Sequence, residues 1–240
     1  MREHKDFLNL DFIENGMDVI EKGILPGNYV FMNMHMVSEY ALNTEGVRDA
    51  LCNSSVFLDG APIWFYLNKM KSRSYARVRG ADFLRQFCES IDDKGSVFFI
   101  GSEDSVLNDL RENLDAGFGG CWERARYFSP KFGGAPEVYS DIERYLLNND
   151  DARYIFLGLG CPKQEVVGDL IRKRFPGLSV FCVGAAFDFI SGNKPEAPEF
   201  MQRVGVEWFY RLLSEPGRTF RRYTVNSYIA IAFLIKVYRG

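Results

Sequence analysis

The sequence contains few of the residues that build metal centres and disulfide frameworks. Its 240 residues include two histidines, both near the N-terminus, and five cysteines without a C-x-x-C pair. An odd number of widely spaced cysteines argues against a disulfide framework, and the shortage of histidine argues against a zinc site. We therefore expect no metal and no other cofactor, and a reducing, cytoplasmic location.

Long hydrophobic runs are also absent. The longest apolar run near the C-terminus is YIAIAFLI at 228–235, well short of the roughly 20 residues that a membrane-spanning helix needs. The N-terminal residues, MREHKDFLNLDF, include no apolar run of signal-peptide length. These absences argue against a membrane-spanning helix and against secretion.

Charge is balanced over the whole chain but not along it. The chain has 29 basic and 32 acidic side chains, a net charge of −3, which argues against a nucleic-acid partner. From Glu199 to Gly240 there are seven basic and three acidic residues, a net +4, so the first 198 residues carry −7. The basic C-terminal end predicts an anionic partner, such as a phosphate or a lipid headgroup.

Six short runs are typical of strands. Most are continuously apolar, as expected for strands that are covered on both faces. Segments of helical length and pattern lie between them, which predicts an α/β, Rossmann-like fold with a mostly parallel six-stranded sheet flanked by helices. The predicted strands are Asn28–Met32, Ser55–Leu58, Ser96–Ile100, Glu123–Tyr127, Tyr154–Leu157 and Ser179–Val183.

After the sixth strand the pattern changes to helices only. Glu199–Leu213 is predicted to form an amphipathic helix, Pro216-Gly217 to end it, and a second helix to run from about Arg218 to Val237. Because no strand follows, we predict two parts: an α/β core over 1–198 and a basic, membrane-proximal helical appendage over 199–240.

Polar residues and glycines follow the predicted strands, at the edge where open parallel sheets bind ligands. Asp59 follows the second strand, where it is either a general base that deprotonates a hydroxyl group or the N-cap of the next helix. Asp188 follows the sixth strand and has the same two interpretations. Asn33 ends the first strand.

The fifth strand leads into a glycine-containing turn, G-L-G-C-P-K-Q-E at 158–165. Gly158 and Gly160 match half of a dinucleotide fingerprint, but Lys163 occupies the third glycine position. The pattern leaves open a tight strand-to-helix turn, whose amide groups could hold an anion, and a nucleotide-binding module or NAD-dependent enzyme.

Arginines are concentrated in the appendage. Arg218, Arg221 and Arg222 have a spacing that places them on one helix face, and Arg211 lies seven residues before Arg218. Guanidinium groups suit phosphate oxygens, although a solvated face with pairs such as Glu207–Arg211 is an equal alternative.

Taken together, these motifs resemble the WecG/TagA/CpsF family of bacterial glycosyltransferases (glycosyltransferase family 26). The likeness runs from about Asn28 to Tyr223. It rests on Asn33, L-D-G at 58–60, R-V-R-G-A-D at 77–82, G-L-G-C-P-K-Q-E at 158–165, V-G-A-A-F-D-F at 183–189, A-P at 197–198, E-W-F-Y-R-L-L at 207–213 and E-P-G-R-T-F-R-R-Y at 215–223.

The resemblance implies an inverting, metal-independent transfer of a sugar from a UDP-sugar to a saccharide on a polyprenyl diphosphate at the inner membrane surface. The sugar would be N-acetylmannosamine, its uronic acid or glucose, in exopolysaccharide or teichoic acid synthesis. The partners are the donor, the lipid-linked acceptor and the membrane, and a homo-oligomer is compatible with the sequence. By position, Asp59 matches the base.

The substrate-binding residues that we predict, from the strand ends and from the resemblance, are Asn33, Arg77, Gly160, Pro162, Lys163, Gln164, Glu165, Gly184, Asp188, Arg211, Arg218, Arg221 and Arg222. Three positions depart from the family pattern. Phe31 replaces a frequent threonine, Ala185 replaces a glycine, and Arg79 replaces a small residue. Phe31 and Arg79 bear on the choice of donor sugar.

Overall fold

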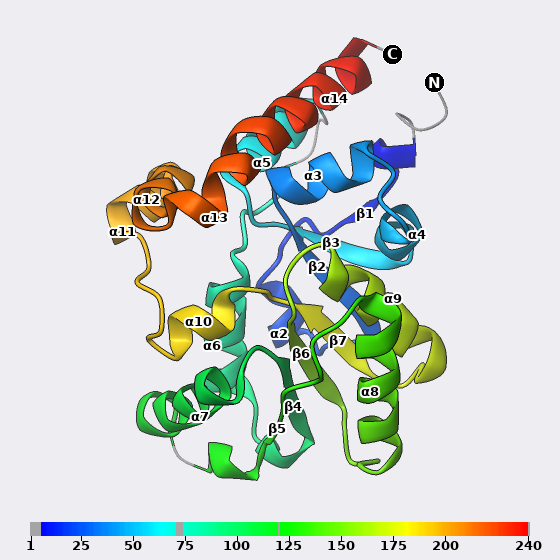
Figure 1. Ribbon diagram of the computed structural model, residues 1–240, viewed down its shortest axis with the longest axis vertical. Helices are drawn as coiled ribbons and strands as arrows, with labels where there is room; N and C mark the ends of the chain where they lie inside the picture. Colours follow the sequence, from blue (N-terminus) through cyan, green and yellow to red (C-terminus); the bar gives the residue numbers. More distant parts are fainter. Residues whose placement is uncertain (1–5, 71–73, 120, 240) are drawn as a thin grey trace.

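The computed structural model describes residues 6–70, 74–119 and 121–239, which form one parallel sheet covered by helices (Figure 1). Within these residues the sheet has seven strands in the order β1-β3-β2-β7-β6-β4-β5. Every paired neighbour is parallel, so all strand carboxyl ends lie at one edge. The strands are β1 (Asp11–Phe12), β2 (Gly27–Met32), β3 (Ser54–Leu58), β4 (Val97–Gly101), β5 (Arg126–Phe128), β6 (Tyr154–Gly158) and β7 (Ser179–Cys182).

Successive side chains of each strand point to opposite faces of the sheet, and helices cover both faces. Val30 and Met32 belong to one buried cluster, with side chains of α3 (Met34–Ala41), α4 (Val47–Cys52), α8 (Ala135–Leu147) and α9 (Lys163–Arg174). Tyr29 and Phe31 belong to the other, with side chains of α6 (Gly80–Ser90), α7 (Asp104–Gly117) and α10 (Ala186–Ile190). Two-sided burial explains why the strand sequences are continuously apolar.

The helical elements before residue 199 are α2 (Asp18–Glu21), α3 (Met34–Ala41), α4 (Val47–Cys52), α5 (Ala61–Met70), α6 (Gly80–Ser90), α7 (Asp104–Gly117), α8 (Ala135–Leu147), α9 (Lys163–Arg174) and α10 (Ala186–Ile190), with 3-10 turns η1 (Lys94–Ser96) and η2 (Trp122–Arg124). The C-terminal elements are α11 (Glu199–Val204), α12 (Glu207–Ser214), α13 (Pro216–Arg221), a π-helical turn η3 (Arg222–Asn226) and α14 (Ser227–Arg239).

The predicted fold class is confirmed, with one more strand than we expected. The additional strand β1 pairs two residues with Ser55 and Val56 of β3, and so short a segment has no periodicity to detect. The fourth predicted strand starts later, because Trp122 is buried at the start of a 3-10 turn and pairing begins only at Arg126.

The predicted first helix of the appendage is two helices. Gly205 separates α11 from α12 in a left-handed conformation with φ of +78°. A Cβ atom at this position would lie 2.3 Å from the Cβ of Ala61, so a larger residue would clash with α5. Gly205 therefore turns the chain while it lies directly against the core.

Helix α14 packs along α3 and shares the buried cluster of that face (Figure 1). The ring of Phe233 lies 5.3 Å from that of Phe7 and 5.8 Å from that of Tyr40. The predicted division at residue 198 stays a prediction, and these contacts indicate that the appendage contributes to the stability of the fold. Within the described ranges, no helix is long and apolar enough to cross a membrane.

Phe233→Ala is expected to reduce the free energy of unfolding by about 3–5 kcal/mol, because it removes a buried aromatic side chain. Ile235 is 45% exposed on the same helix and is the matched control, since Ile235→Ala should change stability by no more than about 0.5 kcal/mol. Urea unfolding followed by circular dichroism measures both. Equal effects of the two variants would show that α14 is not docked on α3.

Candidate active site

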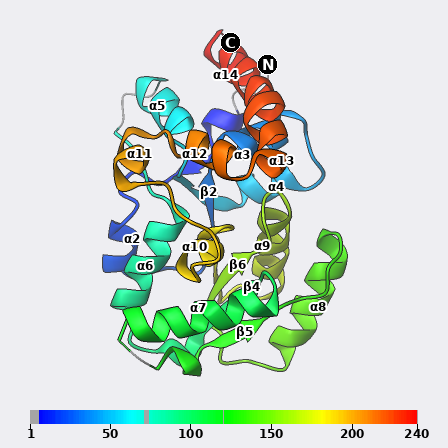
Figure 2. The same cartoon turned by 60° about the vertical axis from the view of Figure 1, so that its left-hand side comes forward.

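A cavity of about 1370 Å³ lies at the carboxyl ends of the strands. Its walls come from the segments that follow β2, β3, β4, β6 and β7 and from the C-terminal helices. Figure 2 shows α11, α12 and α13 above α10, and residues of α12 and α13 line the cavity. A second, smaller cavity of about 360 Å³ adjoins it under α12 and η3.

Five side chains line both cavities and therefore mark their junction. Asn33 and His35 come from the start of α3, Asp59 from the end of β3, and Arg211 and Arg222 from the C-terminal helices. The cavities thus meet at the residue that the sequence predicts as the base, and two arginines, Arg211 and Arg222, line the same junction.

Asp59 is held at this junction by its backbone. Its amide N donates to the carbonyl O of Met32 at 3.0 Å, and the amide N of Gly60 donates to the same oxygen. A Cβ atom on Gly60 would lie 3.1 Å from the Cα of Asn33, so glycine lets β2 and β3 approach closely here. Asn33 caps α3, with its Oδ1 accepting from the amide N of His35 at 3.0 Å.

The pKa of the Asp59 carboxyl group is raised to about 6, mainly by burial and to a smaller extent by the nearby negative charge of Glu207. Arg211, Arg79 and Arg77 act in the opposite direction. A carboxylate with a pKa near 6 is still ionised at neutral pH and is a stronger base than an ordinary aspartate, which suits it to take a proton from a hydroxyl group.

Gln164 holds the turn after β6. Its Oε1 accepts from the amide N of Gly160 at 3.1 Å, and its Nε2 donates to the carbonyl O of Cys182 at 2.9 Å. Gly184 lies against the Gln164 amide group with a φ of +56°. Gln164 therefore joins the ends of β6 and β7 and shapes the cavity wall between them.

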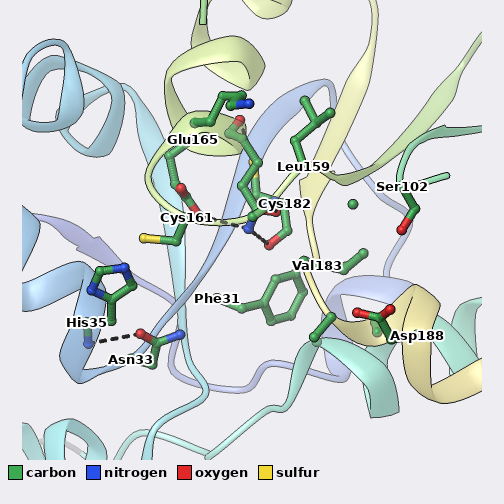
Figure 3. A pocket seen from close by; sticks show the side chains of 18 of the residues that line it. Phe31, Asn33, His35, Ser102, Leu159, Cys161, Glu165, Cys182, Val183 and Asp188 are labelled. Atoms are coloured by element: carbon green, nitrogen blue, oxygen red, sulfur yellow. Dashed lines mark hydrogen bonds between the residues drawn. The ribbon is translucent and has the colours of Figure 1, made fainter. Parts of the chain in front are cut away.

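Other predicted residues of this region also line the larger cavity. Lys163 donates to the carbonyl O of Gly133 at 2.7 Å, which links α9 to the loop after β5. Asp188 forms an ion pair of 2.8 Å with Lys194 on the wall opposite Asn33 and His35 (Figure 3). Pro162 occupies the N-cap position of α9 and is not among the residues that line the cavity.

Glu165 is a fully buried carboxyl group under this turn. Its Oε1 accepts from the Nε2 of Gln164 at 2.9 Å. Its Oε2 has no hydrogen-bond partner among the described residues. Burial raises the pKa of Glu165 to about 7. Between pH 4.5 and 7, the group is therefore protonated to a larger extent in the folded protein than in the unfolded chain.

Three of the four predicted arginines of the appendage line the larger cavity. Arg211 lies over the ring of Phe189, with 4.7 Å between its Cζ and the ring centroid. Arg221 and Arg222 reach the cavity from α13 and η3. The side chain of Arg218 is outside the described part of the structure.

Arg77 has a different environment from the one that we expected of a substrate-binding residue. It lines the smaller cavity, and its guanidinium group donates to the carbonyl O of Asp59 at 2.7 Å and of Gln202 at 2.6 Å. It also forms an ion pair of 2.5 Å with Glu207. Arg77 thus connects the end of β3 to the appendage.

Sequence reasoning missed the roles of several side chains. Glu207 pairs with Arg77 and Arg79, whereas the sequence offered a pair with Arg211 as one of two alternatives. His35, to which the sequence assigned no role, lies at the cavity junction, with its Nδ1 2.7 Å from the side-chain Nδ2 of Asn226. Only the position of Glu207 in the E-W-F-Y-R-L-L motif signalled its importance.

In the described residues, no group of three or more His, Cys, Asp or Glu side chains is arranged to hold a metal.

Glu165→Gln is expected to flatten the dependence of stability on pH. Below pH 4.5 the group is protonated in both states, whereas between 4.5 and about 7 only the unfolded chain releases the proton. The contribution of Glu165 to stability is therefore lost as pH rises through this window, on the order of 3 kcal/mol at about 1.4 kcal/mol per pKa unit. Urea unfolding at pH 4.5 and pH 8 measures it, with the exposed Glu199→Gln as control. A wild-type slope that Glu165→Gln leaves unchanged contradicts the assignment.

Two comparisons with known proteins bear on the class of protein to which this chain belongs. The family model described as "Glycosyl transferase WecG/TagA/CpsF family" matches residues 8–240. One curated relative, from Bacillus spizizenii, is an N-acetylglucosaminyldiphosphoundecaprenol N-acetyl-beta-D-mannosaminyltransferase. It is 29% identical over 184 residues, which cover 75% of this chain and 69% of the relative.

These findings favour a sugar-transferring site over the NAD-dependent alternative, and they agree with the missing third glycine of the dinucleotide fingerprint. With its model matched over nearly the whole chain, the protein belongs to the WecG/TagA/CpsF family of glycosyltransferases.

Proposed function

We propose that this protein transfers N-acetylmannosamine from UDP-N-acetylmannosamine to an N-acetylglucosamine unit on a polyprenyl diphosphate, with inversion at the anomeric carbon. The product would serve the synthesis of a cell-envelope polysaccharide or teichoic acid. The observation that carries this proposal is the position of Asp59, a carboxyl group of raised pKa at the junction of two cavities with arginines beside it.

The larger cavity suits the nucleotide-sugar donor. Its volume exceeds that of a nucleotide sugar, and Arg211, Arg221 and Arg222 line the side that the appendage forms. As the bond between the sugar and UDP breaks, negative charge develops on the diphosphate. Guanidinium groups fixed in place before the reaction stabilise that charge without reorganisation. In this proposal they make a metal ion unnecessary.

The smaller cavity suits the acceptor. Its lining is more apolar and includes Trp208, Tyr223 and Ile231 of the appendage. An acceptor hydroxyl group that enters from this side meets Asp59, which removes its proton. The oxygen then attacks the anomeric carbon from the side opposite to the departing UDP, which inverts the configuration.

The surroundings of Arg79 support an uncharged donor sugar over a uronic acid. Arg79 lines the larger cavity, but its guanidinium group already pairs with Asp82, Glu196 and Glu207. A sugar carboxylate near Asp59 would need a cation of its own, and Arg79 is engaged by three carboxylates. The name of the curated relative supports N-acetylmannosamine among the uncharged candidates.

The exposed surface of the C-terminal helices supports contact with the inner face of the membrane. It carries large apolar side chains: Phe200, Val204, Trp208, Phe209, Leu213, Phe220, Val225, Tyr228, Ile231, Ile235 and Tyr238. Trp208 and Ile231 also line the smaller cavity, so the apolar surface continues into it. Because three arginines line the cavity instead of facing away from it, we expect the apolar side chains to provide most of the membrane affinity.

Asp59→Asn is expected to reduce transfer by about 10²- to 10⁴-fold while the affinity for UDP is retained, because the base is lost and the arginines remain. In the wild type, kcat/KM should fall as pH decreases through about 6, where Asp59 becomes protonated. Transfer from UDP-N-acetylmannosamine to a short-chain N-acetylglucosaminyl-diphospho-polyprenol measures both effects, with EDTA present.

Three results would contradict the proposal. Asp59→Asn with a third of wild-type activity would reject the base. Loss of activity in EDTA that Mn²⁺ or Mg²⁺ restores would reject the role of the arginines. A preference for UDP-glucose or for the uronic acid donor in the same assay would reject the donor.

Replacing Phe209 and Phe220 with serine is expected to weaken binding to vesicles that contain anionic lipid by at least about tenfold. The two side chains are 46% and 61% exposed, and burying each is worth about 1.5–3 kcal/mol. Leu147→Ser is the control, because Leu147 is 57% exposed at the end of α8. Sedimentation with vesicles measures binding, and an unchanged double variant would reject this surface.

A further inference from the structure

A network of ion pairs joins the appendage to the core next to Asp59. Glu207, in the first turn of α12, accepts from Arg77 Nη2 on one carboxylate oxygen and from Arg79 Nε, at 3.2 Å, on the other. Glu207 is 9% exposed. Glu196, which precedes α11, pairs with Arg79 at 2.6 Å and also with Arg85. The network is formed by groups about 110 to 130 residues apart in sequence.

The same arginines hold the neighbouring backbone. Arg77 donates to the carbonyl O of Asp59 as well as to Glu207, so one side chain spans the distance between the base and α12. Gln202 accepts from Arg77 through its carbonyl O and from Arg79 through its side chain. These bonds leave α12 little freedom to move relative to the end of β3.

We propose that Glu207 is a positioning residue: clamped between Arg77 and Arg79, it fixes α12 against the end of β3 so that Arg211 lies beside Asp59 at the junction of the two cavities. Arg211 is one helical turn after Glu207, and residues four apart lie on the same side of a helix. The position of α12 therefore sets the position of Arg211.

The charge of Glu207 gives the same residue a second effect on Asp59. The charged groups near Asp59 are Glu207 and Arg211 of α12 and Arg77 and Arg79 of the segment that leads into α6. From α3 and η3, His35 and Arg222 line the same junction. Glu207 is the negative neighbour in this set and opposes the arginines, which keeps Asp59 more basic than they alone would.

This inference rests on the proposed function, because it takes Asp59 as the base. Glu207→Gln should lower kcat by roughly 10- to 100-fold, since Arg211 is no longer held in place. It should also move the acidic limb of the kcat/KM profile to lower pH, by about 0.5 unit or more, since a negative charge near Asp59 is lost. Thermal unfolding of each variant is measured alongside.

Glu196→Gln is the matched control. It removes a carboxylate from the same network and from the same partner, Arg79, but Glu196 is not among the groups that shift the pKa of Asp59. It should lower thermal stability to a similar extent as Glu207→Gln and leave the acidic limb in place. Glu207→Asp keeps the charge and shortens the reach, so it should lower kcat without moving the limb.

The outcomes are distinct. A limb that stays in place in Glu207→Gln, or moves equally in Glu196→Gln, overturns the electrostatic effect. Wild-type kcat in Glu207→Asp overturns the positioning role, and this variant decides the matter if Glu207→Gln does not fold. Activity retained in Asp59→Asn would instead reject the proposed function, whatever the Glu207 variants show.

Discussion

The architecture depends on one constraint, the burial of a parallel sheet on both faces. Strands that are covered on both sides are mostly apolar, so the polar side chains of the candidate site come mainly from the segments that follow the strands. Because every pair is parallel, all polar strand ends gather at one edge. Asn33, Asp59 and the turn at Gly160 come together for this reason, although more than 100 residues separate the first from the last.

That edge becomes an enclosed site only when the C-terminal segment covers it. Gly205 lets the chain turn while it touches Ala61, and α14 is packed along α3 by Phe233 and its neighbours. Between these two contacts, α12, α13 and η3 carry arginines to the cavity. The part of the chain that we propose to meet the membrane is thus also part of the wall around the proposed reaction centre.

Opposing charges set the chemistry at the junction. Arginines alone would lower the pKa of a carboxyl group and make it a weak base. Without arginines, a buried carboxylate would repel a negatively charged diphosphate beside it. The site contains both kinds of influence: burial and Glu207 raise the pKa of Asp59, and three arginines lower it. This balance leaves Asp59 ionised at neutral pH with a pKa of about 6, next to the arginines that we propose to stabilise the leaving group.

The sequence by itself determined the local features. Continuous apolar runs predicted the strands, the residues after them predicted Asp59 and the turn at Gly160, and the ordered motifs indicated the family. All of these depend on residues that are close together in the chain. The tertiary structure decided which distant residues meet: Glu207 bonds with Arg77 across 130 positions, and the two-residue β1 exists only because β3 lies beside it. An ion pair between distant segments has no sequence period, since its partners are chosen by the packing of the elements that carry them.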